Sequence, residues 1–339
     1  MLLSNGDNEK MAKGLDIGTM NIICSELEGE REVFTQQRNA FLELDSSDLT
    51  KSMLDSAEVF YVEKDGLFYL LGEDALKFSN IFGKEVRRPM RHGIISPKEK
   101  DAIPMIKLIL KWVLRNSSEH LNEILCISSP ADPIDLGMNT LYRRKITEVL
   151  ARGMAYKAHL IDESLALIYS ELSDHEFTGL GISFGAGLTN VTLAYLATPL
   201  ISFSIGRGGD WIDEQVSITT GLPKENVCAK KEGGFTIDPD AEFDRVEGAL
   251  SIYYDALMTY VIENLKRELA EITQPKMEFP VVLAGGTTLP DGFLRWFGPK
   301  LRAAQLQVEI SEIRRAKDPL HSVARGCLIA GRAQEEAEK

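Results

Sequence analysis

The chain has 339 residues, of which 44% are hydrophobic, and its 38 basic and 51 acidic residues give a net charge of −13. A chain of this length and composition is typical of about two globular domains and is not mainly disordered. The negative charge argues against a protein that binds nucleic acid or acidic lipid through a basic surface.

The first segment, residues 1–12, is predicted to be a flexible leader. It has no apolar core behind a basic start, so it does not resemble a signal peptide. It also lacks the basic, aromatic pattern of a membrane-binding amphipathic helix. We therefore expect no direct membrane anchor.

The cysteines indicate the redox environment. The four residues Cys24, Cys126, Cys228 and Cys327 are far apart in the sequence and have no CxxC spacing. This pattern argues against a zinc site or a disulfide framework. We expect free thiols and a cytoplasmic protein.

Two segments of the chain resemble each other. Residues 14–27 and 181–196 both read as an apolar strand, a tight turn with glycine and threonine, and a second apolar strand. In this comparison Gly18 matches Gly185, and Asn21 matches Asn190 after a small insertion. Two hairpins of the same kind indicate an internal duplication.

Helices and strands alternate between and after these hairpins. Buried strands are predicted at 123–130 and 279–286, each ending at small residues. Residues 31–80 form a more β-like insertion, and residues 221–244 form an irregular, charged one. The alternation predicts an α/β fold. The predicted helices are 98–116, 139–155, 164–172, 209–220 and 245–273.

The uncharged stretch 177–206 is long enough to cross a bilayer. It contains several glycines and Pro199, however, and divides into short β-rich runs. Consecutive buried strands joined by tight turns explain it better than a membrane helix.

Three glycine-rich turns follow predicted strands, at 16–21, 183–189 and 284–288. Small residues let backbone N–H groups approach an anion, and threonine hydroxyls add donors. One such turn alone is most often an ordinary hairpin tip. Three of them in a duplicated chain favour phosphate binding, whereas the Walker A and GxGxxG patterns are absent from the sequence.

These turns resemble the motifs of the actin and heat-shock chaperone ATPase superfamily. GLDIGTMN (14–21) is similar to its first phosphate turn, GISFGAGLTNV (181–191) to its second, and VVLAGGTTLPDGF (281–293) to its adenosine motif. Further similarity to the MreB and MamK type of bacterial actin lies at 87–96, 159–170 and 205–216. The similarity extends from about residue 13 to 332 in the family's order.

The resemblance implies two duplicated ribonuclease-H-like halves around a nucleotide cleft. Domain I would comprise 13–162 and 318–339, with an insertion at about 31–80. Domain II would comprise 163–317, with an insertion at about 212–245.

The resemblance also implies binding roles for ATP or ADP with Mg²⁺. Asp16 would hold the metal through water, since Mg²⁺ prefers carboxylate oxygens and keeps waters. The phosphates would be held by Gly18, Thr19, Met20, Asn21, Gly185, Ala186, Gly187 and Thr189. The remaining nucleotide contacts would come from Gly208, Gly209, Asp210, Lys231, Glu232, Gly285, Gly286 and Thr287. A solvated charge run is the alternative interpretation of Lys231 and Glu232.

Catalysis would involve Glu163, Asp16 and Ser183. Glu163 matches the residue that orients the attacking water, although an acidic residue at a helix start is also favoured by the helix dipole alone. The family usually has aspartate where this chain has Ser183, and proline where it has Ser164. The lost carboxylate predicts slow or impaired hydrolysis, so we expect at most a weak ATPase.

The basic cluster of Lys84, Arg87, Arg88 and Arg91 is predicted to form an ion-paired or interface patch, not a nucleic-acid site. The acidic tail, residues 333–339, is predicted to be a solvated helix end.

The leading hypothesis is a cytoskeletal protein that binds ATP and polymerises head to tail. Head-to-tail contacts that do not close into a ring grow into filaments. Its partners would be further copies of itself, with cytoskeletal or organelle adaptors as further candidates. A non-polymerising adaptor of the pilus-assembly type and a small-molecule kinase are the alternatives. Ser183 counts against the kinase, and no peptide-binding domain follows the ATPase motifs as a chaperone would require.

Overall fold

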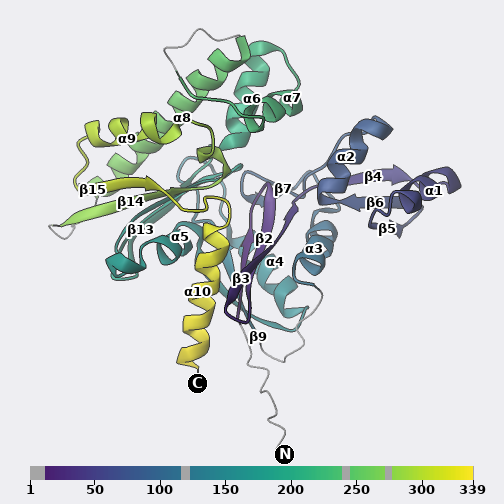
Figure 1. Cartoon of the computed structure of the whole chain (residues 1–339), viewed down its shortest axis with the longest axis horizontal. Coiled ribbons are helices and arrows are strands. Elements are labelled where there is room, and N and C mark those ends of the chain that lie inside the picture. The colour runs from purple at the N-terminus through teal and green to yellow at the C-terminus, as the bar shows by residue number, and fades with distance from the viewer. Residues whose placement is uncertain (1–11, 116–122, 239–244, 272–276, 339) are drawn as a thin grey trace, which may run out of the picture.

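The computed structural model describes residues 12–115, 123–238, 245–271 and 277–338. The leader predicted at 1–12 therefore lies outside the described residues except for Ala12. Two five-stranded sheets dominate the structure (Figure 1).

The first sheet has the order β10-β9-β1-β2-β3, and the second has the order β13-β12-β11-β14-β15. In each sheet, one hairpin continues into a third antiparallel strand, and two parallel strands lie on the other side of the hairpin. The strands of the first sheet are β1 (Lys13–Ile17), β2 (Asn21–Glu28), β3 (Arg31–Arg38), β9 (Glu123–Ser129) and β10 (Tyr156–Asp162). Those of the second are β11 (Gly179–Phe184), β12 (Thr189–Tyr195), β13 (Thr198–Ile205), β14 (Glu278–Ala284) and β15 (Glu309–Arg315). The α/β fold and the internal duplication predicted from the sequence are confirmed.

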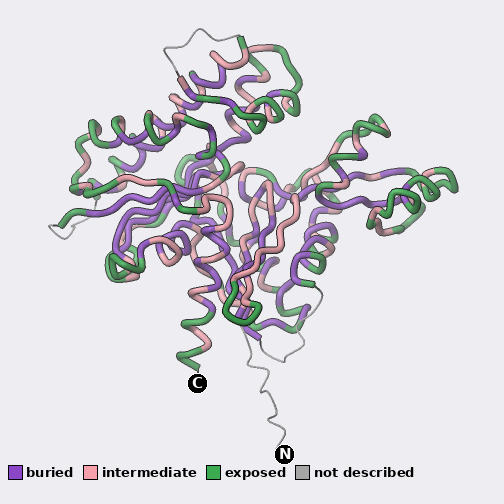
Figure 2. The backbone as a smooth tube through the Cα atoms, in the orientation of Figure 1, coloured by how far each residue is buried: buried purple, intermediate pink, exposed green. Residues whose placement is uncertain are grey.

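The central strands are apolar because helices cover both faces. Every residue of β9 and of β11 is buried (Figure 2). A strand covered on both faces reads as a nearly continuous apolar run. The helices that pack on the outer face of the first sheet are α3 (Ala102–Val113) and α4 (Leu141–Arg152). Those that pack with the second are α6 (Gly209–Thr220), α8 (Arg245–Ala270) and α9 (Phe293–Ala303).

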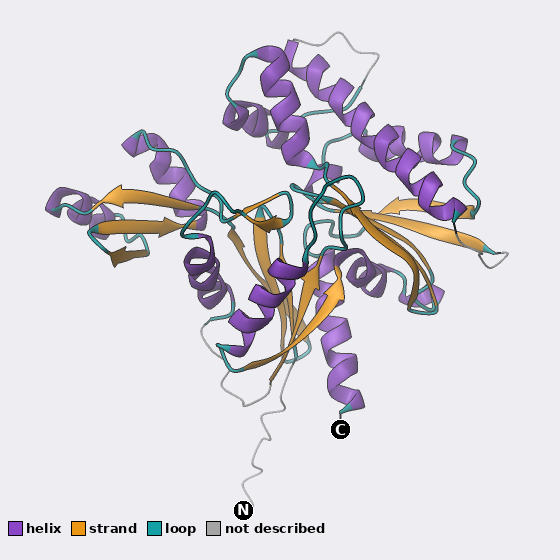
Figure 3. Cartoon of the chain, turned by 180° about the vertical axis from the view of Figure 1, so that it is seen from behind, coloured by secondary structure: helices purple, strands orange, loops and turns teal. Residues whose placement is uncertain are grey.

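Two further helices, α5 (Glu163–Glu171) and α10 (Ser322–Ala337), run between the sheets (Figure 3). They approach each other closely because Gly326 lacks a side chain: a Cβ there would lie 1.7 Å from the carbonyl oxygen of Ala166. Gly14 in β1 allows α10 to pack closely for the same reason, since a Cβ at this position would lie 2.3 Å from Ala324 O. The last helix of the chain therefore packs directly on the first sheet.

A small separate sheet, of order β4-β6-β5, lies beside the first sheet at the right of Figure 1. It has its own apolar core, which includes Leu44, Leu54 and Phe68. The insertion was expected at 31–80, but β3 belongs to the first five-stranded sheet, so the small sheet and its helices begin at Phe41. Its elements are β4 (Phe41–Asp45), α1 (Asp48–Ser56), β5 (Tyr61–Lys64), β6 (Leu67–Leu71) and α2 (Gly72–Phe82).

A short hairpin connects this small sheet to α3. Its strands are β7 (Met90–Arg91) and β8 (Ile94–Ile95). The two residues between them, His92 and Gly93, have φ values of 48° and 70°. Positive φ at both positions is what a tight two-residue hairpin turn requires.

One secondary-structure prediction is wrong. Residues 221–244 were expected to be irregular, but Lys224–Glu232 form helix α7. Pro223 directly before it, Glu225 in its first turn and the lysines in its last turn are start and stop signals that favour a helix. Residues 239–244 of the predicted insertion lie outside the described residues.

The uncharged stretch forms strands, and the cysteines are free thiols, as expected. Residues 177–206 contain β11, β12 and β13, and across the described ranges we find no helix with the length and apolarity that a membrane crossing needs. None of the four cysteines forms a disulfide, and burial raises the pKa of Cys24 and of Cys228 to about 12. The remaining elements are the short 3-10 helices η1 (Ser173–His175) and η2 (Gly286–Thr288).

Candidate functional site

The two hairpins β1–β2 and β11–β12 have turns of the same length and hydrogen bonding. The N–H of Gly18 donates to the carbonyl of Asn21 at 2.8 Å, and the N–H of Gly185 donates to that of Leu188 at 2.9 Å. Gly18 therefore corresponds to Gly185, as predicted. Asn21, however, corresponds to Leu188 and not to Asn190, so the inferred insertion does not exist.

The strand register also places Ser183 at the position of Asp16. Asp16 is paired with Ile23 across the first hairpin, and Ser183 is paired with Asn190 across the second. The two hairpins thus differ in the side chain at one equivalent strand position, and only one of them carries a carboxylate there.

The three glycine-rich turns converge on one cavity of about 430 Å³ between the two sheets. Most of the residues that the sequence predicted for a nucleotide site line this cavity. They are Asp16, Gly18, Thr19, Met20, Asn21, Glu163, Ser183, Gly185, Ala186, Gly187, Gly209, Asp210, Lys231, Glu232, Gly285, Gly286 and Thr287.

Two predicted residues, Thr189 and Gly208, lie behind the lining. The Thr189 hydroxyl donates to the carbonyl of Arg207 at 2.8 Å, which directs it toward the segment between β13 and α6. Gly208 lies against the second turn, where a Cβ would come within 2.5 Å of Gly185 O. Both residues support the turn from outside the cavity.

Glycine is required where the turns approach each other. A Cβ on Gly187 would lie 2.5 Å from Thr19 Oγ1 and 2.8 Å from Gly93 N. The carbonyl of Gly185 accepts hydrogen bonds from the Gly209 N–H at 3.0 Å and from the Thr287 hydroxyl at 2.9 Å. The second turn therefore contacts the first turn, the start of α6 and the third turn.

Two partly buried carboxyl groups lie at the floor of the cavity. Asp16 Oδ1 accepts a hydrogen bond from Ser128 Oγ at 2.6 Å, and Glu163 Oε1, at the start of α5, accepts one from Ser183 Oγ at 2.8 Å. Burial raises the pKa of Asp16. Burial and, next, the charge of Asp16 raise the pKa of Glu163 to about 7. In place of a second strand carboxylate, the site thus has a hydroxyl that orients Glu163.

A buried arginine accompanies these carboxyl groups and was missed by the sequence analysis. Arg143 in α4 is 3% exposed and lines the cavity. Burial lowers its pKa to about 10, so the guanidinium remains charged at neutral pH. Its helical spacing could have indicated this position, because Thr147, Leu150 and Ala151 are buried on the same face of α4 as Arg143.

Ion pairs cross the mouth of the cavity. Arg38 at the end of β3 pairs with Glu232 in α7 (Nη2–Oε2, 3.0 Å) and with Glu73 in α2 (Nε–Oε1, 3.0 Å). Lys231 Nζ donates to Asp213 Oδ1 at 2.7 Å and to the carbonyl of Gly209 at 3.1 Å, and its side chain is 10% exposed. Lys231 is therefore not part of a solvated charge run, whereas Glu232 lies at the surface in an ion pair.

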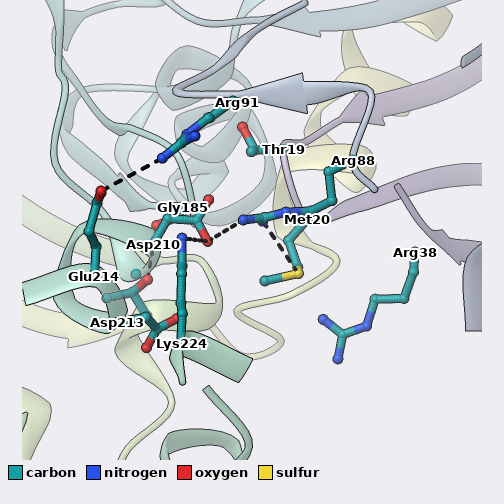
Figure 4. A network of polar contacts seen from close by, with 12 residues as sticks. Thr19, Met20, Arg38, Arg88, Arg91, Gly185, Asp210, Asp213, Glu214 and Lys224 are labelled. Atoms are coloured by element: carbon teal, nitrogen blue, oxygen red, sulfur yellow. Dashed lines mark hydrogen bonds and ion pairs between the residues drawn. The ribbon is translucent and has the colours of Figure 1, made fainter. Parts of the chain in front are cut away.

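The basic cluster is ion-paired, as predicted. Arg88 and Arg91, at the β7–β8 hairpin, reach across to α6, where Arg88 Nη2 lies 3.0 Å from Asp210 Oδ1 and Arg91 Nη2 lies 3.7 Å from Glu214 Oε1 (Figure 4). Lys224 also lies 3.8 Å from Asp210 Oδ1. The other two members of the cluster pair with carboxylates of their own half: Arg87 with Glu43 and Glu99, and Lys84 with Asp45.

Three side-chain oxygens fit a polar ligand in the cavity. Asn21 Oδ1, Asn190 Oδ1 and Asp210 Oδ2 are buried, belong to lining residues, and have no hydrogen-bond partner within the described part of the chain. They can accept hydrogen bonds from hydroxyl groups or metal-bound water. Over the same residues, no group of three or more His, Cys, Asp or Glu side chains could hold a metal ion. The carboxylate and amide oxygens that are present fit a hard cation that keeps several waters, such as Mg²⁺.

Two sheets of equal strand order around a cavity lined by glycine turns define the actin-like ATPase fold, and solved structures confirm it. A MamK double helical filament is 18% identical, with a TM-score of 0.69 over 96% of this chain and 98% of that chain. MreB 5 of Spiroplasma citri bound to AMPPNP is 16% identical, with a TM-score of 0.70 over 96% and 97%. The ethanolamine utilization protein EutJ from Carboxydothermus hydrogenoformans is 14% identical, with a TM-score of 0.56 over 94% and 90%.

Within this fold, the family model described as Volactin matches residues 11–331. The chain belongs to the Volactin family. The sequence-based resemblance to actin-like proteins of the MreB and MamK type is thereby confirmed at the level of the fold.

Proposed function

We propose that the chain is a cytoskeletal protein that binds ATP with Mg²⁺ in this cavity and polymerises into filaments. The observation that carries the proposal is the convergence of three glycine-rich turns, from distant parts of the chain, on one cavity. Two solved structures with the same fold, of MreB 5 and of a MamK mutant, are bound to AMPPNP.

The phosphates would lie between the first and second turns. Gly187 lies close to Thr19, so the backbone of the first turn would lie on one side of the ligand and the backbone of the second turn on the other. Adenosine would lie against the third turn, Gly285 to Thr287, and near Lys231. Asp210, whose Oδ2 has no partner in the described residues, is available to accept a hydrogen bond from a ligand hydroxyl or water.

For hydrolysis, Mg²⁺ would neutralise phosphate charge when bound, with Asp16 on its water shell. Glu163 would orient the attacking water and accept its proton, because a carboxylate with a pKa near 7 suits a general base at neutral pH. The Ser183 hydroxyl would fix the Glu163 carboxylate but supply no charge. We therefore propose slow hydrolysis.

Polymerisation is proposed on the fold and on the exposed apolar side chains at the outer ends of the molecule. Leu49 in α1 and Ile81 in α2 are 73% and 62% exposed, and Ile218 in α6 and Ile252 in α8 are 73% and 67% exposed. Contacts between chains would take these apolar side chains out of water, which is favourable. Head-to-tail contacts that do not close produce filaments.

Under this proposal, domain I comprises 13–162 and 318–339, and domain II comprises 163–317. The protein would act in the cytoplasm, with copies of itself and adaptor proteins as partners. No nucleic acid is expected to bind.

Sedimentation with and without ATP and Mg²⁺ tests the assembly. We expect filaments in the pellet with ATP, visible by negative-stain microscopy, and less pellet without nucleotide. A protein that binds ATP yet stays monomeric at every concentration would instead be a non-polymerising adaptor.

A further inference from the structure

We propose that Arg143 is a positioning residue that locks the first phosphate-binding turn to the tip of the β7–β8 hairpin. The proposal rests on the proposed function, because the turn matters only if the cavity binds a phosphate-bearing ligand.

The Arg143 guanidinium joins two segments that are distant in sequence. Its Nη2 donates to the carbonyl of Ile17, the residue directly before the first turn, and its Nη1 donates to the carbonyl of Gly93 at 2.7 Å. Two donors of one planar group thus hold two backbone oxygens. A lysine, with a single ammonium on a flexible stem, does not present this rigid fork.

Gly93 closes a ring of contacts. Its N–H donates to Thr19 Oγ1 at 3.2 Å, while its carbonyl accepts from Arg143. Thr19 follows Ile17 by two residues, so the chain itself completes the ring. The turn cannot move relative to the hairpin without breaking at least one of these bonds.

The second half of the molecule packs on the same point. Gly187 comes so close that a Cβ would lie 2.8 Å from Gly93 N, and a Cβ on Gly93 would lie 2.1 Å from Leu188 Cδ1. The arms of the hairpin region reach α6 through Arg88 and Arg91. A hairpin tip released from Arg143 would therefore loosen the contact between both phosphate turns.

The charge of Arg143 also suits its place. Asp16 and Glu163 are the acidic groups whose charges act on it most strongly, and its own charge offsets part of the rise that burial causes in the pKa of both. Charge alone, however, would not require the two hydrogen bonds to carbonyl groups. Arg143→Lys keeps the charge and removes the fork, whereas Arg143→Met removes both.

The matched control is Arg152→Met. Arg152 is in the same helix, but its side chain is 65% exposed and pairs with Glu148. A second variant, Thr19→Val, breaks the ring from the other side with little change in volume. If an Arg143 variant fails to fold, Thr19→Val still tests the proposal.

The test is hydrogen exchange of the protein without nucleotide, followed by equilibrium binding of ATP with Mg²⁺. We expect Arg143→Lys and Thr19→Val to raise exchange in the peptides that cover 14–21 and 87–96, with other peptides unchanged. We expect both variants to weaken ATP binding by about tenfold or more, since bonds of this kind are lost from a buried site. Arg152→Met should match the wild type in both measurements.

Unchanged exchange in both peptides for Arg143→Lys would overturn the proposal, because the fork would then be dispensable. A uniform rise over the whole chain would also overturn it, since that indicates a merely structural role. If the wild type binds no ATP, the proposed function fails, while the exchange comparison still decides whether Arg143 and Thr19 hold the hairpin.

Discussion

The β1–β2 and β11–β12 hairpins are alike in backbone and different in charge. Both have the same turn length and turn hydrogen bond, and both face the same cavity. The first strand of the first hairpin carries Asp16, which accepts a hydrogen bond from Ser128. The second hairpin has Ser183 at the equivalent position, and Ser183 donates a hydrogen bond to Glu163. Duplicated topology thus supplies the turns, while the helices α4 and α5 supply Arg143 and Glu163. The predictions below separate what each hairpin contributes.

The largest effect is expected for Glu163→Gln, the partner of the second hairpin. This change keeps the size and hydrogen-bonding capacity of the side chain but removes the base. Phosphate release should fall by about 10²–10⁴-fold, the range that general acid–base catalysis supplies. Single-turnover phosphate release measures this. The dissociation constant for ATP should stay near that of the wild type, and a large increase in it would assign Glu163 to binding instead.

The next effect concerns the first hairpin. Asp16→Asn removes the carboxylate that would hold metal-bound water, and it should weaken Mg²⁺-dependent ATP binding by about 10–100-fold, as is typical when outer-shell metal partners are changed. Titrations of ATP at several Mg²⁺ concentrations measure this change. Equal affinity of the variant and the wild type at every Mg²⁺ concentration would show that the first hairpin does not act on the metal.

A smaller change is expected for Ser183→Asp, which makes the second hairpin resemble the first. A second carboxylate facing metal-bound water should raise phosphate release or tighten Mg²⁺ binding. Ser183→Ala is the control, because it removes the hydroxyl bond to Glu163 without adding charge. Wild-type turnover as fast as that of Ser183→Asp would mean that another group already supplies the missing charge.

The smallest effect is expected at the cavity mouth. Arg38 links Glu73 and Glu232 across it, and both acidic side chains are about half exposed, at 54% and 46%. Exposed ion pairs contribute about 0.2–1 kcal/mol, so Arg38→Met should speed nucleotide release by roughly 1.4- to 5-fold. Stopped-flow displacement of a fluorescent nucleotide measures the rate. Lys77→Met, which breaks the exposed pair with Asp74, is the control and should leave the rate unchanged.

The sequence predicted well those features that are local. Each glycine turn is determined by a few adjacent residues, and so are the strands that precede it, which is why the three turns could be found. The ion-paired nature of the basic cluster also followed from composition, although its partners did not. The match of Asn21 with Asn190 failed because only the strand register shows which residues are opposite each other.

Other features depend on contacts between distant residues. Arg143 lies in a run of three basic residues; its helical spacing from Leu150 and Ala151 marks it as the one that faces inward, but only the structure shows that it bonds to Gly93. The Arg38–Glu232 pair joins residues 194 positions apart. No local pattern in the sequence could reveal either contact.

The central claim is that the two hairpins close on one nucleotide, and calorimetric titration of ATP with Mg²⁺ tests it most directly. We expect the wild type to bind one ATP per chain with a dissociation constant in the micromolar range, about −8 kcal/mol. Gly187→Ala should abolish this binding, because the added Cβ would meet Thr19 Oγ1 at 2.5 Å, whereas Gly137→Ala, where nothing lies within 4 Å, should bind as the wild type does. Equal binding by Gly187→Ala and wild type, or no binding by folded wild type at about 1 mM ATP, would contradict the account.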